Sequence, residues 1–491
     1  MPYYDRMSIN SSINLQEIAC RAMLEEDFIL DLPSGVLAEN GNAENDLKTK
    51  LDSEAIDLRH LLWSSIDNED SRDLDQLEVA EQSETEEIRV RVAIADVDAY
   101  VRKDSEIDGY ARQNTTSVYT GVQTFPMLPR ALSEDLTSLL ENKDRLAIVT
   151  DFAVAKDGEV KLNGIYRAFV RNRAKLDYDS VGDFLDGKNE FPVQIPGLAE
   201  QIRLQDEAAD RLRAVRLREG ALEFETVEAT TVKNLNGEIY LTVKQKNQAR
   251  YLIENLMITA NVLMARFLEA NNCPALKRIV RRPERWQRIV QLAADFGENL
   301  PDAPDSIALA DFLERRRAAD PIHFPDLSLS VVKLIGAGDY TVDKPGEPET
   351  NGHFGLAVSY YTHSTAPNRR FADLITQRLV KAVIKNAPAP YSIEELEQIA
   401  ARCNERQSAA RKVERKMRKA VAAQFLSGRT GETFQGIVTG VSKKGVFVRL
   451  LDPPAEGKIV VNEIGADVGD QVSVRLLKTD ANHGFIDFER I

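Results

Sequence analysis

The feature that most constrains the fold is a long segment with a broad apolar face. Residues 247–272 repeat apolar side chains at helical spacing, which predicts one long helix. The apolar face consists of Ala249, Leu252, Ile253, Leu256, Met257, Ala260, Leu263, Met264 and Phe267. Because a face this broad has to be buried, we expect the helix to lie in the core of a large domain.

The segments around this helix mix strand and helix patterns. Residues 88–101 begin with strict alternation of apolar and polar side chains, and residues 147–170 read as two strands around a turn at Asp157–Gly158. Residues 369–386 and 392–428 have helical patterns. We therefore predict an α+β fold, with a large mixed domain over residues 61–427.

The two ends of the chain differ from this middle part. Residues 15–30 place apolar side chains at helical spacing and a polar, acidic stretch follows, which predicts a small, mainly helical N-terminal module and linker over residues 1–60. At the other end, five short alternating runs are separated by Gly, Pro, Asp and Asn. This pattern predicts a five-stranded barrel over residues 428–491.

The charge balance excludes one class of protein. Lysine and arginine number 63 against 78 acidic residues, which gives a net charge of −15. Such a charge argues against a protein that coats nucleic acid non-specifically, but not against an enzyme with a local basic groove. The basic run at residues 277–286 is the local exception; we interpret it as a basic surface helix, with a nucleic-acid entry as the alternative.

Cysteine spacing and hydropathy indicate the compartment in which we expect the protein. Cys20, Cys273 and Cys403 are too far apart for a disulfide framework or a zinc ribbon, which favours a reducing, cytoplasmic location. The first residues lack the pattern of a secretory signal. No uninterrupted apolar run approaches the roughly 18 residues of a membrane span, so we expect no association with a membrane.

A short acidic segment carries the first sign of chemistry. Residues 66–76 read IDNEDSRDLDQ, and a loop with Asp67, Asp73 and Asp75 could bind two divalent cations through carboxylate oxygens. Two such ions can activate water and stabilise the leaving oxygen in phosphodiester hydrolysis. On composition alone, the more ordinary interpretation is a solvated acidic turn.

Five segments in a fixed order resemble the RNB domain of the RNase II/RNase R family of exoribonucleases. The first is residues 66–76, and the strongest is YTHSTAPNRRFADLI at residues 361–375. The others are FPMLPRALS at 125–133, RYLIENLMI at 250–258 and HFGL at 353–356. The final part of the chain resembles the S1-like domain, an RNA-binding barrel that follows the RNB domain in this family.

The resemblance implies a hydrolase that degrades single-stranded RNA from its 3′ end, releases 5′-mononucleotides and requires Mg²⁺ or Mn²⁺. The clustered acids of the family fall at Asp67, Asp73, Asp75 and Gln76. Asp67 and Asp73 would be metal ligands, and Asp75 matches the acid on which catalysis depends most. Gln76 departs from the family pattern, because a neutral amide can ligate a cation but brings no charge. We therefore expect one of the two ions to be held more weakly.

The resemblance also implies residues that contact RNA. Arg369 falls where the family has an arginine near the scissile phosphate, and Arg370 is a second candidate; the ordinary alternative for Arg369 is an ion pair with Asp373. The remaining candidates are the stacking rings Tyr119 and Phe224, the acids Glu254 and Glu414, and, in the barrel, Phe434, Phe447, Lys443 and Lys444. The alternatives are a place in the core for Tyr119, Phe224 and Phe447, and a surface charge for Glu414.

Three functions are compatible with these patterns. The first is an active, monomeric exoribonuclease with a weaker second metal ion. The second is a catalytically silent RNB homologue that only binds RNA; Gln76 favours it, and the joint presence of the three aspartates and Arg369 disfavours it. The third is an endonuclease or a DNA-directed nuclease with similar metal ions.

Overall fold

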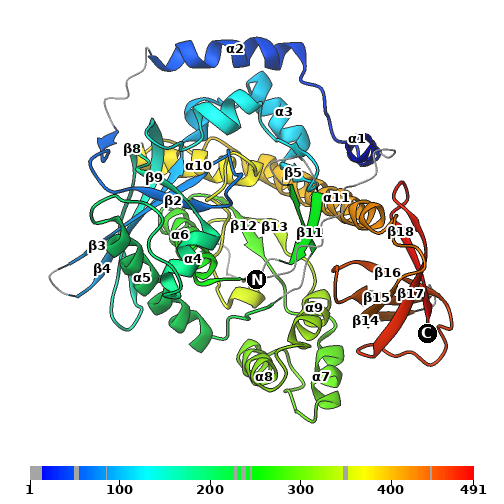
Figure 1. The fold of residues 1–491 in the computed structure, drawn as a ribbon. Helices are drawn as coiled ribbons and strands as arrows, with labels where there is room; N and C mark the ends of the chain where they lie inside the picture. Colours follow the sequence, from blue (N-terminus) through cyan, green and yellow to red (C-terminus); the bar gives the residue numbers. More distant parts are fainter. Residues whose placement is uncertain are drawn as a thin grey trace.

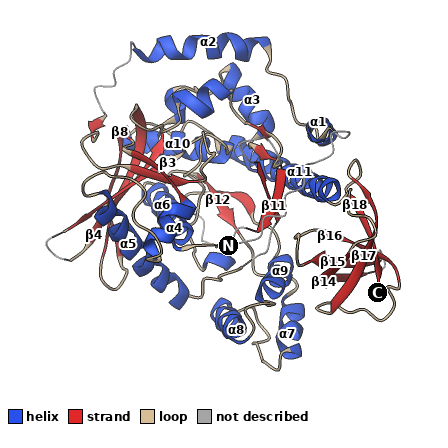
Figure 2. Cartoon of the chain, in the orientation of Figure 1, coloured by secondary structure: helices blue, strands red, loops and turns tan. Residues whose placement is uncertain are grey.

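The structure is a computed structural model that describes residues 14–48, 55–83, 86–225, 229–233, 239–243, 246–346, 352–442 and 445–491. Lys443 and Lys444 lie outside the described residues. The α+β prediction is confirmed, because a large sheet-based domain carries a helical N-terminal region and a C-terminal barrel (Figure 1, Figure 2).

The large domain is built on a mixed seven-stranded sheet with the order β1-β8-β7-β4-β3-β2-β9. The strands are β1 (Ile56–Asp57), β2 (Ser64–Asp67), β3 (Gln76–Gln82), β4 (Ile88–Ala95), β7 (Asp144–Val154), β8 (Val160–Arg171) and β9 (Ala174–Asp177). The predicted hairpin turn is confirmed between the antiparallel strands β7 and β8. There Gly158 has a φ of +87°, and a Cβ atom would lie 2.5 Å from the carbonyl oxygen of Arg211.

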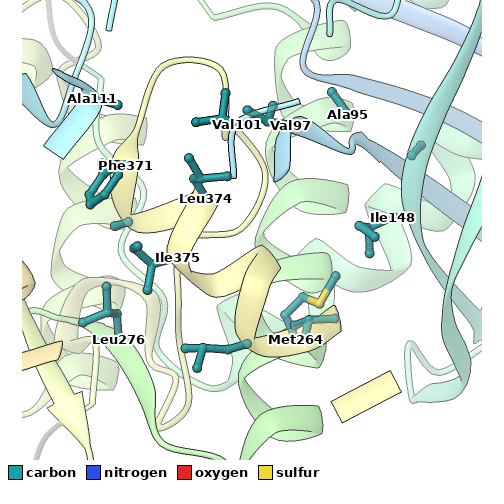
Figure 3. Close-up of a cluster of buried hydrophobic side chains, with 14 of the residues drawn as sticks. Ala95, Val97, Val101, Ala111, Ile148, Met264, Leu276, Phe371, Leu374 and Ile375 are labelled. Atoms are coloured by element: carbon teal, nitrogen blue, oxygen red, sulfur yellow. The ribbon is translucent and has the colours of Figure 1, made fainter. Parts of the chain in front are cut away.

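Both faces of this sheet are covered. One face packs on η1 (Val97–Ala99) and α10 (Phe371–Ile384), in a cluster that includes Leu77 and Val79 of β3 and is shown in part in Figure 3. The other face packs on α4 (Tyr178–Leu185), α5 (Leu198–Arg218) and α6 (Gln248–Ala270), in a cluster that includes Ala80. Because alternate residues of a strand point to opposite faces, every residue in the middle of β3 enters a covered interface.

Helix α6 is the long helix that the sequence predicts, and its place in the core is confirmed. Leu252 and Leu256 pack in one of the two clusters, and Met264 and Leu268 reach the other. Within the described residues, α6 alone is long and apolar enough to span a membrane. However, 67% of its apolar window is buried inside the fold, as expected for a core helix.

The helical N-terminal region lies against the large domain. Its helices and their neighbours are α1 (Leu15–Glu25), α2 (Ser34–Lys48), α3 (Glu106–Asn114) and α11 (Ile393–Phe425). Helix α1 packs on α11, and α2 contacts α3. The contact between α1 and α11 buries Ile18 and Met23 together with Val413 and Met417 of α11. Helix α1 of the N-terminal region is therefore packed onto the fold.

The C-terminal segment forms the predicted five-stranded barrel. Its strands are β14 (Thr433–Ser442), β15 (Gly445–Leu450), β16 (Glu456–Val461), β17 (Gln471–Asp480) and β18 (Phe485–Arg490), closed in the order β14-β15-β16-β18-β17. Ala423 and Leu426, at the end of α11, join the barrel core. Arg449 Nη2 lies 2.8 Å from Asp326 Oδ1 of α9 (Phe324–Ile335), which ties the barrel to a second helix.

The basic run at residues 277–286 is not the surface helix that we predicted. Lys277 and Arg278 are buried in β12 (Ala275–Ile279), which pairs with β13 (Asp339–Asp343). Arg278 is buried because its guanidinium stacks on the Tyr340 ring, 4.8 Å from the centroid, and donates to Gln407. The remaining elements are β5 (Val118–Tyr119), β6 (Thr124–Phe125), η2 (Leu132–Leu136), β10 (Ala229–Lys233), β11 (Ile239–Val243), α7 (Trp286–Asp295), α8 (Ser306–Ala319) and η3 (Phe354–Leu356).

Met23→Ala is expected to loosen α1 from α11, because Met23 is 2% exposed and fills the cluster between these helices. Truncating a buried methionine costs about 2–5 kcal/mol. Native-state hydrogen exchange at the amides of α1 should therefore give a lower free energy of opening. Leu24→Ala is the matched control, because Leu24 is 59% exposed. Identical exchange in both variants would show that α1 does not depend on this contact.

Candidate active site

The acidic loop between β2 and β3 is fixed by hydrogen bonds along its length. Asp67 Oδ1 accepts from the hydroxyl of Ser71 at 2.9 Å. Ser138 Oγ donates to Arg72 O at 2.6 Å and accepts from Leu74 N at 3.0 Å. The loop therefore has one defined path from the end of β2 to the start of β3.

Asp75 joins this loop to the segment that precedes α10. Its Oδ2 atom lies 3.0 Å from Arg369 Nε, and its Oδ1 atom accepts from Asn368 N at 3.1 Å. Asp75 is buried, whereas 45% of the Arg369 side chain is exposed. Among the described residues, the Nη groups of Arg369 form no hydrogen bond, so they can bind an anion. The alternative partner, Asp373, accepts from Arg370 Nη2 instead, at 2.6 Å.

A short hairpin, β5–β6, brings Tyr119 to the same place. The Tyr119 hydroxyl donates to Asp73 Oδ2 at 2.8 Å, and 41% of the residue is exposed. The hairpin is tied to the segment before α10 by its backbone, because Ser117 N donates to Arg369 O at 3.0 Å. Tyr119 is therefore not a core residue, and its ring lies beside the acids.

The acids and Arg369 share one electrostatic environment. Desolvation alone would lower the pKa of Arg369, but Asp75, Tyr119, Asp67 and Asp73 raise it above its ordinary value. Burial raises the pKa of Asp75 to about 7, because Arg369 offsets only part of the desolvation and Asp73 adds to it. Negative charge thus exceeds positive charge here, and a further cation would stabilise the site.

Asp75 contacts Arg369, Asp73 contacts Tyr119, and the charge of Asp67 raises the pKa of Arg369, but the three acids do not form a closed cage. In the parts of the chain that are described, no three His, Cys, Asp or Glu side chains are close enough to hold one metal ion by themselves. Hydrogen bonds from neighbouring side chains occupy some of the carboxylate oxygens. A hard cation here would complete its shell with water and phosphate oxygens, as Mg²⁺ usually does.

Strand β3 carries a buried acid that the sequence analysis missed. Gln76, its first residue, is buried. Glu78 is fully buried, and neither of its carboxylate oxygens has a hydrogen-bond partner among the described residues. Burial and the charge of Asp67 raise the pKa of Glu78 well above its ordinary value. The available signal was an acid two residues after Gln76, which puts it on the same face of the strand.

Arg250 is a second residue that the sequence analysis did not single out. Its guanidinium stacks on the Tyr178 ring, 4.2 Å from the centroid, and donates to Asn68 Oδ1 at 3.3 Å. Because Asn68 directly follows Asp67, Arg250 lies beside the acidic loop. The available signal was the basic residue that opens the motif RYLIENLMI.

The other RNA contacts predicted for the large domain have ordinary structural partners. Phe224 packs against the apolar cluster of α7, α8 and α9, which is the alternative that the sequence left open. Glu254 lies 2.7 Å from Lys246 Nζ through its Oε2 atom. Glu414 is half-buried on α11. Their roles toward RNA stay predictions.

The two barrel phenylalanines differ in orientation. Phe447 is half-buried and lies between Val446 and Val448, which belong to the barrel core, so its ring points outward. Phe434 is 5% exposed and lies in the core itself. The Phe434 ring is therefore not displayed on the surface, contrary to the prediction, because the alternation of β14 turns Phe434 inward and its neighbour Gln435 outward.

Aromatic rings support the segment at residues 361–370. The hydroxyl oxygen of Tyr340 and Nδ1 of His363 are 2.7 Å apart, and the ring centroids of His353 and Tyr361 are 5.4 Å apart. Burial and the neighbouring charge of Arg278 lower the pKa of His353 to about 4. The imidazole is therefore neutral near pH 7 and packs as an uncharged ring.

Two family models match the chain. The RNB domain matches residues 55–386, and the RNase II-type exonuclease C-terminal S1 domain matches residues 432–491. The chain belongs to the RNB family. The first match contains the acidic loop, Tyr119 and Arg369, and the second contains the barrel.

Curated relatives are similar over most of this chain. Ribonuclease R of Escherichia coli K12 is 32% identical over 453 residues, which cover 88% of this chain and 55% of that protein. Ribonuclease R 1 of Lactococcus lactis is 28% identical over 495 residues, which cover 94% of this chain and 59% of that protein. The chain thus spans little more than half the length of these relatives.

Solved structures share the fold. Mycoplasma genitalium RNase R in complex with ribose-methylated single-stranded RNA has a TM-score of 0.87 at 22% identity, with 99% of this chain and 79% of that chain covered. Yeast Ssd1, a pseudonuclease, has a TM-score of 0.70 at 15% identity, with 94% of this chain and 57% of that chain covered. At these identities the similarity establishes the fold and not the activity.

His353→Asn is expected to make the fold less sensitive to acid. Nδ1 of His353 accepts from Leu356 N at 3.1 Å, and asparagine can accept in the same way. Folding lowers the pKa of this histidine from 6.5 to about 4, so the unfolded chain binds the proton more readily. The free energy of unfolding therefore falls as the pH falls from about 6.5 to about 4, because protonation of His353 favours the unfolded chain.

The asparagine variant should lack this loss, which is about 3 kcal/mol for a pKa lowered from 6.5 to about 4. Chemical denaturation of both proteins across this pH range gives the comparison. If the two stability profiles run parallel, His353 is not held in its neutral form by the fold.

Proposed function

We propose that this chain is a 3′–5′ exoribonuclease that hydrolyses single-stranded RNA to 5′-mononucleotides. The observation that carries the proposal is the contact of the buried Asp75 with the partly exposed Arg369, beside Asp67 and Asp73, in an RNB domain. Further support comes from relatives named Ribonuclease R and from a solved relative that is bound to single-stranded RNA.

The proposed enzyme would use Mg²⁺ or Mn²⁺, held by Asp67, Asp73, Asp75 and Gln76. This donor set fits such ions, because carboxylate and amide oxygens are hard ligands and the site carries excess negative charge. A bound ion of this kind supplies Lewis acidity toward water and toward the scissile phosphate.

The side chains of the site would position the RNA end. Arg369 can donate its free Nη groups to the phosphate, while Asp75 fixes the guanidinium through Nε. The exposed ring of Tyr119 can stack on a terminal base, and its hydrogen bond to Asp73 couples the ring to the acids. Positioning and charge neutralisation supply most of the rate in phosphoryl transfer.

The barrel would hold the RNA upstream of this site. Phe447 points outward on β15 and can stack on a base. Stacking tolerates any sequence, which suits an enzyme that degrades many RNAs. Discrimination between RNA and DNA would rest on contacts to the 2′-hydroxyl.

A second candidate function is RNA binding without hydrolysis. Gln76 favours it, because one acid of the family pattern is neutral here, and the fold also occurs in the pseudonuclease Ssd1. The contact between Asp75 and Arg369 favours an enzyme, since binding alone gives no reason to bury a carboxylate beside the phosphate-binding arginine.

Asp75→Asn should stop hydrolysis and keep RNA binding. Asparagine preserves the volume and an acceptor for Asn368 N, but removes the charge that faces Arg369. We expect mononucleotide release to slow by about 100-fold or more. Oligoribonucleotides labelled at either end, incubated with Mg²⁺ or Mn²⁺, report the rate and the direction of degradation, and filter binding reports the affinity.

Asp70→Asn is the matched control, because Asp70 is an exposed acid of the same loop, and its turnover should not change. Unchanged turnover in the Asp75 variant would exclude Asp75 from the reaction. An unmodified chain that binds both labelled RNAs and leaves them intact would favour the second candidate function.

Tyr119→Ala and Tyr119→Phe separate two roles of this side chain. Alanine removes base stacking, worth about 1–3 kcal/mol, so RNA should bind roughly 5- to 150-fold more weakly. Phenylalanine keeps the ring and loses only the hydrogen bond to Asp73, so affinity should hold while hydrolysis slows. Fluorescence anisotropy on an Asp75→Asn background measures affinity without degradation. Undiminished binding by the alanine variant would rule out stacking.

A further inference from the structure

Glu78 is a carboxylate that the fold buries without a partner. It is fully buried on β3, and neither of its oxygens forms a hydrogen bond with any described residue. An ionised carboxylate in such a place is strongly destabilised unless a cation compensates it. A buried polar group of this kind therefore requires an explanation, and a bound ion is one.

The position of Glu78 links it to the acidic loop. Strands β2 and β3 are antiparallel with Ser64 opposite Glu78, and β2 then runs to Asp67 at its end. Gln76 and Glu78 point to the same face of β3 because they are two residues apart. Burial and the charges of Asp67 and Glu78 raise the pKa of Tyr178, so this ring lies near both carboxylates.

The basic side chain nearby does not compensate Glu78. Arg250 stacks on Tyr178 and donates to Asn68 Oδ1, next to Asp67. Glu78 itself accepts no hydrogen bond from a described residue. No basic side chain among the described residues therefore compensates the carboxylate of Glu78 through a hydrogen bond.

We propose that Glu78 supplies the carboxylate that Gln76 lacks, so that Asp67, Gln76 and Glu78 together bind one divalent cation. The inference rests on the proposed nuclease function, because it names ligands on the Asp67 side of that site. An amide replaces one acid of the family pattern, and an acid stands two residues further on the same face of the strand. The site thereby keeps its number of carboxylates, with one of them moved along β3.

The competing explanation is a protonated glutamic acid that only fills space. The hydroxyl of Ser64, opposite Glu78, also lacks a partner among the described residues, and a protonated Glu78 could donate to it after a small rotation. An uncharged isostere at this position would then leave metal binding unchanged and would not destabilise the fold. The two explanations therefore differ in metal affinity.

Glu78→Gln in the whole chain tests the inference without RNA. Mn²⁺ alone is titrated, and the free ion is counted by electron paramagnetic resonance. We expect the variant to bind one Mn²⁺ about tenfold more weakly or worse, the scale of changes that remove a supporting group from a metal site. Glu69→Gln is the matched control, because it makes the same chemical change in an exposed acid of the loop.

A double variant guards against a general loss of structure. Combining Gln76→Asp with Glu78→Gln moves the carboxylate back to the start of β3, and Mn²⁺ affinity should recover. If Glu78→Gln fails to fold by circular dichroism, Glu78→Leu with and without Gln76→Asp gives the same comparison with a side chain of similar volume. A folded double variant that does not regain affinity counts against the inference.

The outcomes separate the inference from the proposed function. Undiminished Mn²⁺ binding by Glu78→Gln overturns the inference and leaves the nuclease function standing. Weaker Mn²⁺ binding by this variant, in a chain that hydrolyses no RNA, supports the metal site and removes the nuclease function. An unmodified chain that binds no Mn²⁺ overturns the inference.

Discussion

The contact between the buried Asp75 and the partly exposed Arg369 joins two segments that are 294 residues apart in the chain, and the candidate site depends on it. Arg369 offsets only part of the desolvation of Asp75, so the contact needs support from the fold around it. Asn368 gives that support, because its N–H group donates to Asp75 and its side-chain oxygen accepts from Thr137. Strand β3 begins directly after Asp75, so the contact lies where the sheet meets the segment before α10.

Excess negative charge is the consequence of this arrangement. The charges of Asp67, Asp73 and Asp75 all raise the pKa of one partly exposed guanidinium, and the charge of Asp67 also raises the pKa of the buried Glu78. No three of the described acids are close enough to hold an ion alone, so phosphate oxygens would complete the coordination shell. Cation and RNA would then each raise the affinity of the other, since each supplies what the other needs.

Features that follow from the side-chain periodicity of one segment could be predicted from the sequence. Features that depend on how helices and sheets pack on one another could not. Helix α6, the β7–β8 hairpin and the barrel all follow from patterns within one segment. The burial of Glu78 could not be predicted in this way. Alternation in β3 is typical of a sheet with one solvated face, whereas here α5 and α6 cover that face. Phe434 was misplaced because barrel closure decides which face of β14 points inward. No local pattern pairs Arg369 with Asp75; only the family resemblance brought the two together.

The N-terminal region extends the support of the site to Tyr119. Val118, the neighbour of Tyr119 on β5, is buried in the same cluster as Met23 of α1. The chain after α1 is held at Ile29, whose N–H and C=O groups both hydrogen-bond the side chain of Asn114 at 3.0 Å. Because adjacent strand residues point to opposite faces, Val118 can be anchored in this cluster while the ring of Tyr119 stands exposed beside the acids. Packing of α1 and the hydrogen bond from Tyr119 to Asp73 therefore act on one short strand. Together they set where a stacked base would lie.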